Sequence, residues 1–190
     1  LRIARAAGGL DIDPLNARSS ASGDPLPDPT KGTADSASVL TIAIAKADTD
    51  KRIVYGVVLD PYVVDAHADW IPPADVEKTA HDWLARSRAI GVQHTKRALD
   101  AEPVESYLVP YPTDEDYRSA VAGKPHAAYR LKLGTDRVHS GAWVLATRLS
   151  PSLWARVKSG ELGAYSIGGF GVRTPTDRQA MPEVSFVDVG

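Results

Sequence analysis

The stretch from Gly160 to Val172, GELGAYSIGGFGV, contains the residue types of a serine hydrolase site. Ser166 is its one serine, and Gly168 and Gly169 follow two and three positions later. A reactive serine needs a neighbouring base and backbone N–H groups that bind the oxyanion. The same glycines are also typical of a β-bulge or a barrel corner. From these residues alone both interpretations stay open.

Histidine is the usual general base near neutral pH, and the chain has five: His67, His81, His94, His126 and His139. His94 ends the apolar stretch IGVQH, so a buried strand would deliver its imidazole to the rim of a core. His81 is expected on the solvent side of a helix. His126 and His139 are expected in loops. Position therefore favours His94 as the base.

A metal site is a weaker interpretation of the segment DPYVVDAHAD, which holds Asp60, Asp65, His67 and Asp69. Its spacing matches neither the HExxH motif nor an EF-hand loop, and the chain has no cysteine. A turn rich in aspartate explains the same residues. No Walker sequence or GxGxxG ahead of a helix is present. We therefore expect neither a metal nor an organic cofactor.

Composition limits the function classes. The chain has 190 residues, 43% of them hydrophobic, and a formal net charge of −2. That balance argues against a general affinity for nucleic acid or an anionic membrane. No apolar run approaches the roughly 20 residues that span a bilayer, and the first ten residues lack a signal-peptide pattern. The absence of cysteine excludes disulfides and thiol catalysis.

Residues 1–38 are predicted to form a flexible arm, because the segment from Asp11 to Ser38 is rich in Pro, Asp, Ser, Gly and Ala and has little to bury. Residues 39–190 are predicted to form one domain. Strands are expected at 39–47, 52–61, 103–111, 140–150, 164–172 and 182–189, the first two as a hairpin. Residues 89–95 form a short apolar segment, and 112–137 are ambiguous.

Two helices are predicted. One begins at Pro72-Pro73, with Val76, Ala80 and Trp83 on one face. The other has Ser150 as N-cap, Pro151 at its first position and Gly160 at its end. Short strands that outnumber helices predict an α+β fold, mainly β: a small barrel or sandwich decorated by helices.

Several segments in order resemble a family of phage proteins. YGVVLDPYVVDAHADWIPPADVEKTAHDWL is similar to the opening segment of the XkdF-type phage serine proteases, IGVQH to their histidine segment and PVESY to the strand that follows. GAWVLATRLSPSLWARVKSGELGAYSIGG and PEVSFVDVG resemble their S-I-G-G block and closing strand. The resemblance runs from about Tyr55 to the C-terminus. It implies the small β-barrel of the prohead proteases, which herpesvirus assemblins share.

The resemblance also implies roles for named residues. Ser166 would be the nucleophile, His94 the general base and Glu105 the third member that orients the imidazole. Asp65 and His67 are alternatives for that third role. Backbone N–H groups at Gly168 and Gly169 would bind the oxyanion.

The implied function is that of a serine endopeptidase of prohead maturation, acting in the host cytoplasm inside the phage prohead. Its substrates would be phage scaffold and major capsid proteins, with self-cleavage of the arm as a further option. A homo-oligomer is compatible with this function, whereas a membrane or specific nucleic-acid partner is not expected. Two alternatives are a catalytically inactive head assembly protein with the same barrel and a cation-binding interaction module.

Overall fold

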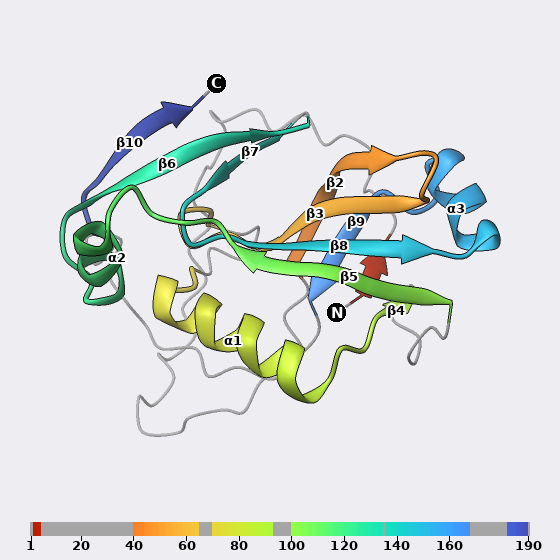
Figure 1. Cartoon of the computed structure of the whole chain (residues 1–190), viewed down its shortest axis with the longest axis horizontal. Helices are drawn as coiled ribbons and strands as arrows, with labels where there is room; N and C mark the ends of the chain where they lie inside the picture. The colour runs from red at the N-terminus through yellow and green to blue at the C-terminus, as the bar shows by residue number, and fades with distance from the viewer. Residues whose placement is uncertain are drawn as a thin grey trace, which may run out of the picture.

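The structure is a computed structural model that describes residues 2–4, 40–64, 70–92, 100–134, 136–167 and 182–189. The described part contains a large and a small β-sheet with three helices around them (Figure 1). It is therefore mainly β with peripheral helices, as predicted.

The large sheet has seven strands in the order β4-β1-β9-β2-β3-β8-β5. Their bounds are β1 Arg2–Ala4, β2 Leu40–Asp48, β3 Ile53–Leu59, β4 Gly91–Val92, β5 Ala101–Leu108, β8 Trp143–Leu149 and β9 Ala164–Ile167. All neighbours are antiparallel except β1 and β4, which are parallel. This sheet carries both Ser166 and Glu105.

The small sheet has the order β10-β6-β7, with β6 at His126–Leu133, β7 at Asp136–His139 and β10 at Val184–Val189. β6 and β7 form a hairpin, and β10 pairs in parallel with β6. The last strand of the chain thus joins a hairpin formed some fifty positions earlier, which only tertiary contacts can specify.

Three helices complete the described part: α1 at Pro73–Arg86, α2 at Asp114–Val121 and α3 at Pro151–Lys158. Side-chain caps begin two of them: Thr113 accepts from the Asp116 amide at 3.1 Å, and Ser150 accepts from the Leu153 amide at 3.2 Å. None of these helices combines the length and the apolar character that a membrane span requires.

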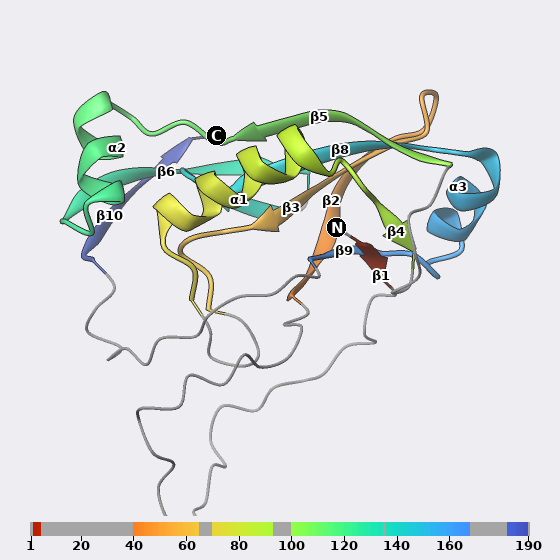
Figure 2. The ribbon, with the colours of Figure 1, turned by 90° about the horizontal axis from the view of Figure 1, so that it is seen from below.

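The main core lies on the inner face of the large sheet. Trp143 and Leu145 of β8 are fully buried there with Val76 and Ala80 of α1. Val92 from one edge of the sheet and Leu108 from the other belong to the same cluster. The sheet therefore curls around a single core that α1 covers (Figure 2).

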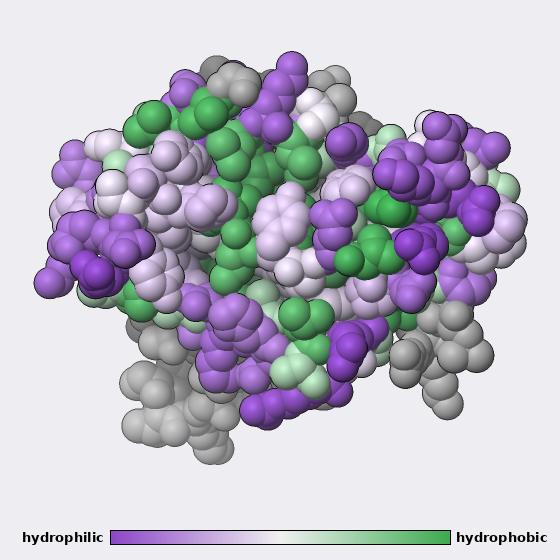
Figure 3. Space-filling view, in the orientation of Figure 1, coloured by the Kyte–Doolittle hydropathy of each residue, from purple (hydrophilic) through white to green (hydrophobic). Residues whose placement is uncertain are grey.

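A second cluster joins the two sheets. Val57 and Val144 on the large sheet pack with Val138 of the small sheet, and Leu131 and Leu133 lie against them. Figure 3 shows a band of hydrophobic residues near this junction. The small sheet is thus held mainly by burial of apolar surface.

The expected closed barrel is not formed by the described strands. β4 and β5 are the two edges of the large sheet and are not hydrogen-bonded to each other. The described part of β4 is Gly91 and Val92, which pair with β1. α1 packs against β5 and β8 and fills the interior that a barrel would fill with strand side chains.

The predicted hairpin, both predicted helices and the strands at β5, β8, β9 and β10 are confirmed, with bounds that differ by a few residues; residues 168–172 of the predicted strand at β9 lie outside the described residues. The segment 112–137 proved to hold α2, β6 and the start of β7. Arg2–Ala4, inside the predicted arm, form β1; residues 5–39 lie outside the described residues, so the arm and the domain boundary stay predictions.

Gly134, in the turn between β6 and β7, has a φ of +62° and lies against β2: a Cβ there would be 1.9 Å from the Ala45 carbonyl oxygen. Gly134→Ala should therefore lower the free energy of unfolding by about 2–4 kcal/mol, combining left-handed strain with a backbone clash. Urea denaturation measures this. Gly123→Ala is the matched control, because Gly123 has a φ of +66° and open space around its Cβ. Equal losses for the two variants would refute the proposed clash.

Candidate active site

Ser166 lies on β9, one residue before the strand ends. Its backbone pairs with Thr41 of β2 on one side and with Arg2 of β1 on the other. The preceding residue, Tyr165, is 1% exposed, and its hydroxyl donates to the Val54 carbonyl at 3.2 Å. Burial raises the pKa of Tyr165. The strand that carries the candidate nucleophile is therefore anchored in the core.

The segment before β9 is fixed by α3. Ser150 and Pro151 start that helix, and Gly160 ends it with a φ of +76°, a left-handed conformation that glycine adopts without strain. Leu162 is then buried at 1% exposure, and the Gly163 carbonyl accepts from the Ile44 amide at 2.8 Å. The S-I-G-G block is thus held at a defined place on the sheet up to Ile167.

The chain that leads to His94 runs close to Ser166. Gly91 and Val92 form β4, and Arg2 pairs with Gly91 on one side and Ser166 on the other. Two strand spacings, about 10 Å, therefore separate the backbones of Gly91 and Ser166. His94 comes two residues after Val92, and two residues of extended chain span at most about 7 Å. The described strands therefore place Val92, two residues before His94, two strand spacings from Tyr165, and His94 itself lies outside the described residues.

Glu105 lies on β5, at the other edge of the large sheet. Three strands separate β5 from β9, so the distance along the sheet is about 19 Å. Glu105 pairs with Ala146, and its carboxylate accepts from the Tyr55 hydroxyl at 3.2 Å. This carboxylate is exposed. The described contacts engage Glu105 with Tyr55, and its predicted role beside His94 stays a prediction.

The other predicted site residues lie outside the described residues. They are His94 itself, the oxyanion candidates Gly168 and Gly169, and the alternatives Asp65 and His67. Their roles stay predictions.

A chain of hydrogen bonds links Tyr111, Tyr62 and His126. His126 is 8% exposed, and its Nδ1 lies 2.7 Å from the Lys124 carbonyl, which can only accept. In the neutral ring Nε2 is then the acceptor, so the Tyr62 hydroxyl donates to it at 2.6 Å and accepts from Tyr111 at 3.0 Å. Burial raises the pKa of Tyr62 and raises that of Tyr111 to about 12.

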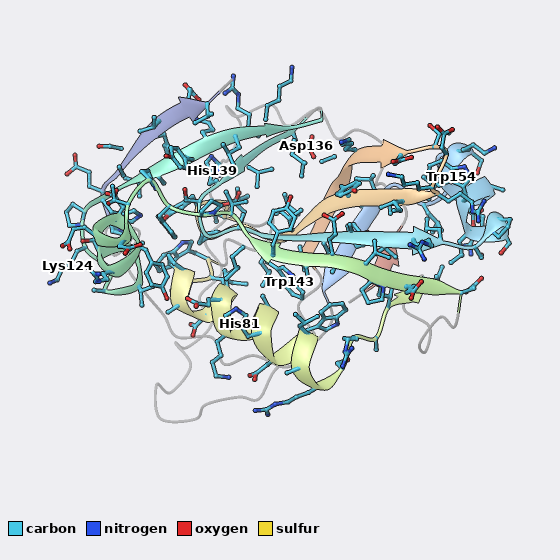
Figure 4. All side chains as sticks on the ribbon, in the orientation of Figure 1. His81, Lys124, Asp136, His139, Trp143 and Trp154 are labelled. Atoms are coloured by element: carbon cyan, nitrogen blue, oxygen red, sulfur yellow. The ribbon has the colours of Figure 1, made fainter. Side chains whose placement is uncertain are left out.

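A carboxylate–imidazole pair lies beside this chain. The side chain of Asp60 is 4% exposed, and its Oδ2 accepts from Nδ1 of His139 at 2.8 Å. Its Oδ1 accepts from the Tyr62 amide at 2.9 Å. The His139 ring lies against the rings of Phe186 and Tyr62, at centroid distances of 4.8 and 5.9 Å. Figure 4 shows His139 on β7, far from His81 on α1.

The Asp60–His139 pair resembles the acid and histidine of a catalytic triad. The neighbouring hydroxyl, that of Ser140, is however hydrogen-bonded to backbone groups. Ser140 donates to the Pro110 carbonyl at 2.7 Å and accepts from the Tyr129 amide at 2.8 Å. The cluster connects the turn after β3 with β6, β7 and β10. We assign it a structural role as the polar part of the junction between the sheets.

The expectation that His126 and His139 are loop residues is wrong, since both lie in strands and make buried contacts. His81 is exposed, as expected. Among the residues of this cluster, sequence reasoning singled out only Asp60 as a candidate ligand, through its place among acidic residues. Its partner lies 79 positions away. Within the part of the chain that the structure describes, no group of three or more His, Cys, Asp or Glu side chains could hold a metal ion.

Asp60→Asn should destabilise the fold. The amide keeps one oxygen acceptor where the carboxylate offered two, so one buried donor, the Tyr62 amide or His139 Nδ1, loses its partner. We expect a loss of about 1–3 kcal/mol in the free energy of unfolding, measured by urea denaturation at pH 7. Asp50→Asn, in the exposed turn after β2, is the control and should change stability by less than about 0.5 kcal/mol. Equal stability of the two variants would exclude a structural role for the pair.

The comparisons with known proteins agree on one family. Residues 41–174 match the family model described as "Putative phage serine protease XkdF". "Uncharacterized protein YqbD" of Bacillus subtilis (strain 168) is 33% identical over 126 residues, 66% of this chain and 34% of that protein. "Phage-like element PBSX protein XkdF" of the same organism is 33% identical over 120 residues, 63% of this chain and 37% of that protein.

The chain thus spans about a third of the length of these two relatives. No solved structure matches it. The family match includes β2, β3, the three helices and the S-I-G-G block with Ser166. The chain belongs to the family whose model is described as "Putative phage serine protease XkdF".

Proposed function

We propose that this chain is a serine endopeptidase domain that cleaves scaffold or capsid protein extensions during maturation of the phage prohead. Ser166 attacks the scissile carbonyl, and His94 takes up its proton and later delivers it to the leaving amine. Gly168 and Gly169 supply backbone N–H groups to the oxyanion. No metal or organic cofactor takes part in this proposal.

The observation that carries the proposal is the register around β1. Arg2 pairs with both Ser166 and Gly91, which sets the nucleophile strand two places from the strand that leads to His94. The same register pairs Val92 with Ile3 and Ile3 with Tyr165, so the proposal requires the chain after Val92 to turn back toward Ser166 for His94 to act as the base. The family description, which names a phage serine protease, supports the same reaction class.

The proposal leaves the third triad position to Glu105, Asp65 or His67. Glu105 can fill it only if its carboxylate leaves Tyr55 and meets His94 from the opposite edge of the sheet. The third member can be identified with three variants, Glu105→Gln, Asp65→Asn and His67→Gln. The variant that loses the group that orients His94 should reduce turnover by up to about 10⁴-fold, whereas the other two should not. The measurement is the rate of product formation with each variant at saturating substrate.

Covalent labelling tests the nucleophile directly. A fluorophosphonate probe should modify Ser166 in the folded chain, because an activated serine attacks the phosphorus in the place of a carbonyl. Peptide mass spectrometry locates the adduct. His94→Ala should slow the labelling at least about 100-fold, consistent with loss of a general base.

Ser159 is the internal control, since it is exposed and its hydroxyl donates to the Arg156 carbonyl. Labelling of Ser166 no faster than that of Ser159 would contradict the proposal. A chain that is folded and unreactive would instead favour the alternative of an inactive head assembly protein.

A further inference from the structure

A small groove lies between α1 and α2, away from β9. Its volume is about 240 Å³. Pro73 and Glu77 of α1 form one wall, and Asp114, Tyr117 and Val121 of α2 form the other. The last residue of β5, Leu108, and the segment 109–111 that follows it form the floor. Tyr117 spans the groove, donating its hydroxyl to the Glu77 carboxylate at 2.9 Å.

The groove has an apolar interior that remains open to solvent. Leu108, Val109 and Pro110 line the floor. At the rim, Tyr117 and Val121 are 41% and 40% exposed, although both are large apolar or aromatic side chains. Tyrosine is enriched among the side chains that anchor protein interfaces. These residues would bury further surface if a partner covered them.

The charge at this groove is negative. Glu77 and Asp114 line it, and the described lining residues include no lysine or arginine. The nearby cations are paired elsewhere: Arg118 with Glu115 at 3.3 Å and Lys78 with Asp82 at 3.0 Å. Asp114 forms no ion pair with a described residue. A positively charged partner would therefore meet complementary potential here.

The size of the groove decides between a small molecule and a peptide. Sites for small organic ligands usually measure about 300–1,000 Å³, so this groove is smaller than that class. It is large enough for one aliphatic or aromatic side chain. The negative charge at the rim then favours lysine or arginine next to that side chain in the partner.

We propose that this groove docks a segment of a partner protein that presents one large apolar side chain flanked by lysines or arginines. The apolar side chain enters between Tyr117 and the floor, and the cations face Glu77 and Asp114. The inference does not depend on Ser166, because the groove is built by α1, α2 and the end of β5.

The test is an NMR titration of the ¹⁵N-labelled full chain carrying Ser166→Ala, so that no probe is cut. The probes are three capped peptides with central sequences Lys-Leu-Lys, Glu-Leu-Glu and Lys-Gly-Lys. We expect Lys-Leu-Lys to bind with a Kd of about 1 mM or lower, at least tenfold tighter than the other two. The shifted amides should centre on Val109, Tyr111, Tyr117 and Gly141.

Two matched pairs of variants locate the contact. Val121→Lys should weaken Lys-Leu-Lys binding at least fivefold, whereas Leu84→Lys, which changes a residue with 41% exposure elsewhere on α1, should not. Glu77→Gln should weaken it about threefold, whereas Glu115→Gln, outside the groove lining, should not. Both comparisons use exposed or half-exposed positions, and the amide spectrum reports whether each variant is folded.

Equal binding of Glu-Leu-Glu would overturn the charge argument, and equal binding of Lys-Gly-Lys would overturn the apolar anchor. Shifts centred outside the groove, or no shifts up to about 5 mM peptide, would overturn the site itself. Fluorophosphonate labelling is unaffected by all of these outcomes, so failure of the docking site and failure of the proposed protease activity are distinguishable.

Discussion

Under the proposed mechanism, Ser166→Ala abolishes processing of phage scaffold and capsid proteins, with a fall of about 10⁴-fold or more in the rate of peptide-bond cleavage. The alanine removes the only atom that can form the acyl-enzyme, whereas the strand around it stays anchored through Tyr165 and its bond to Val54. Purified chain mixed with the head proteins of its phage, followed by intact mass spectrometry, measures the cleavage. His94→Ala should have a similar effect, because a serine without its base is a weak nucleophile.

The rate losses caused by Ser166→Ala and His94→Ala should not add in the double variant. A nucleophile and its base act as one unit, so the double variant should be about as slow as either single variant. Ser159→Ala is the control and should leave the rate unchanged, since this exposed serine lies at the end of α3. Normal cleavage by Ser166→Ala would refute the hydrolase mechanism and leave the fold and the family unaffected.

Trp143→Ala should have the largest effect on stability. This side chain is 0% exposed in the main core, lies 5.4 Å from the ring of Trp83 and donates from Nε1 to Ser106 at 3.0 Å. Figure 4 shows it on β8 next to α1. Its removal leaves a large cavity and an unpaired serine hydroxyl, so we expect a loss of about 3–5 kcal/mol. Differential scanning calorimetry should show a fall in Tm of roughly 10 °C.

Trp143→Phe separates the contribution of the buried volume from that of the hydrogen bond to Ser106. It keeps most of the buried volume but loses the bond to Ser106, so a loss of about 1–3 kcal/mol is expected. Leu84→Ala, at a 41% exposed position on α1, should change stability by less than about 1 kcal/mol. A Trp143→Ala loss no larger than that of Leu84→Ala would show that the core is not organised around this tryptophan.

Local signals predicted most of the fold. The hairpin of β2 and β3, the Pro72-Pro73 start of α1 and the Ser150 cap of α3 each rest on residues a few positions apart. The helix α2 was missed although Thr113 and Asp116 form a capping pair, because its eight residues offer only a weak apolar pattern. A short polar helix is held by contacts with β6 and α1 that no local pattern reveals.

The barrel was predicted from strand number and from the family resemblance, and the described sheet stays open. Closure depends on whether the two edge strands meet, and here α1 packs inside the curl beside β5. Strand pairing over long sequence distances is decided by packing, so a count of strands cannot determine it.

The sequence by itself determined the family and the α+β class, because motifs and hydrophobic periodicity are local properties, and its choice of Ser166 and His94 stays a prediction. The tertiary structure alone decided that Arg2 links the strand of Ser166 to the strand that leads to His94. It also decided that Asp60 pairs with His139 across 79 positions. Such contacts form only when burial of the surrounding core outweighs the entropy of closing the loop between them.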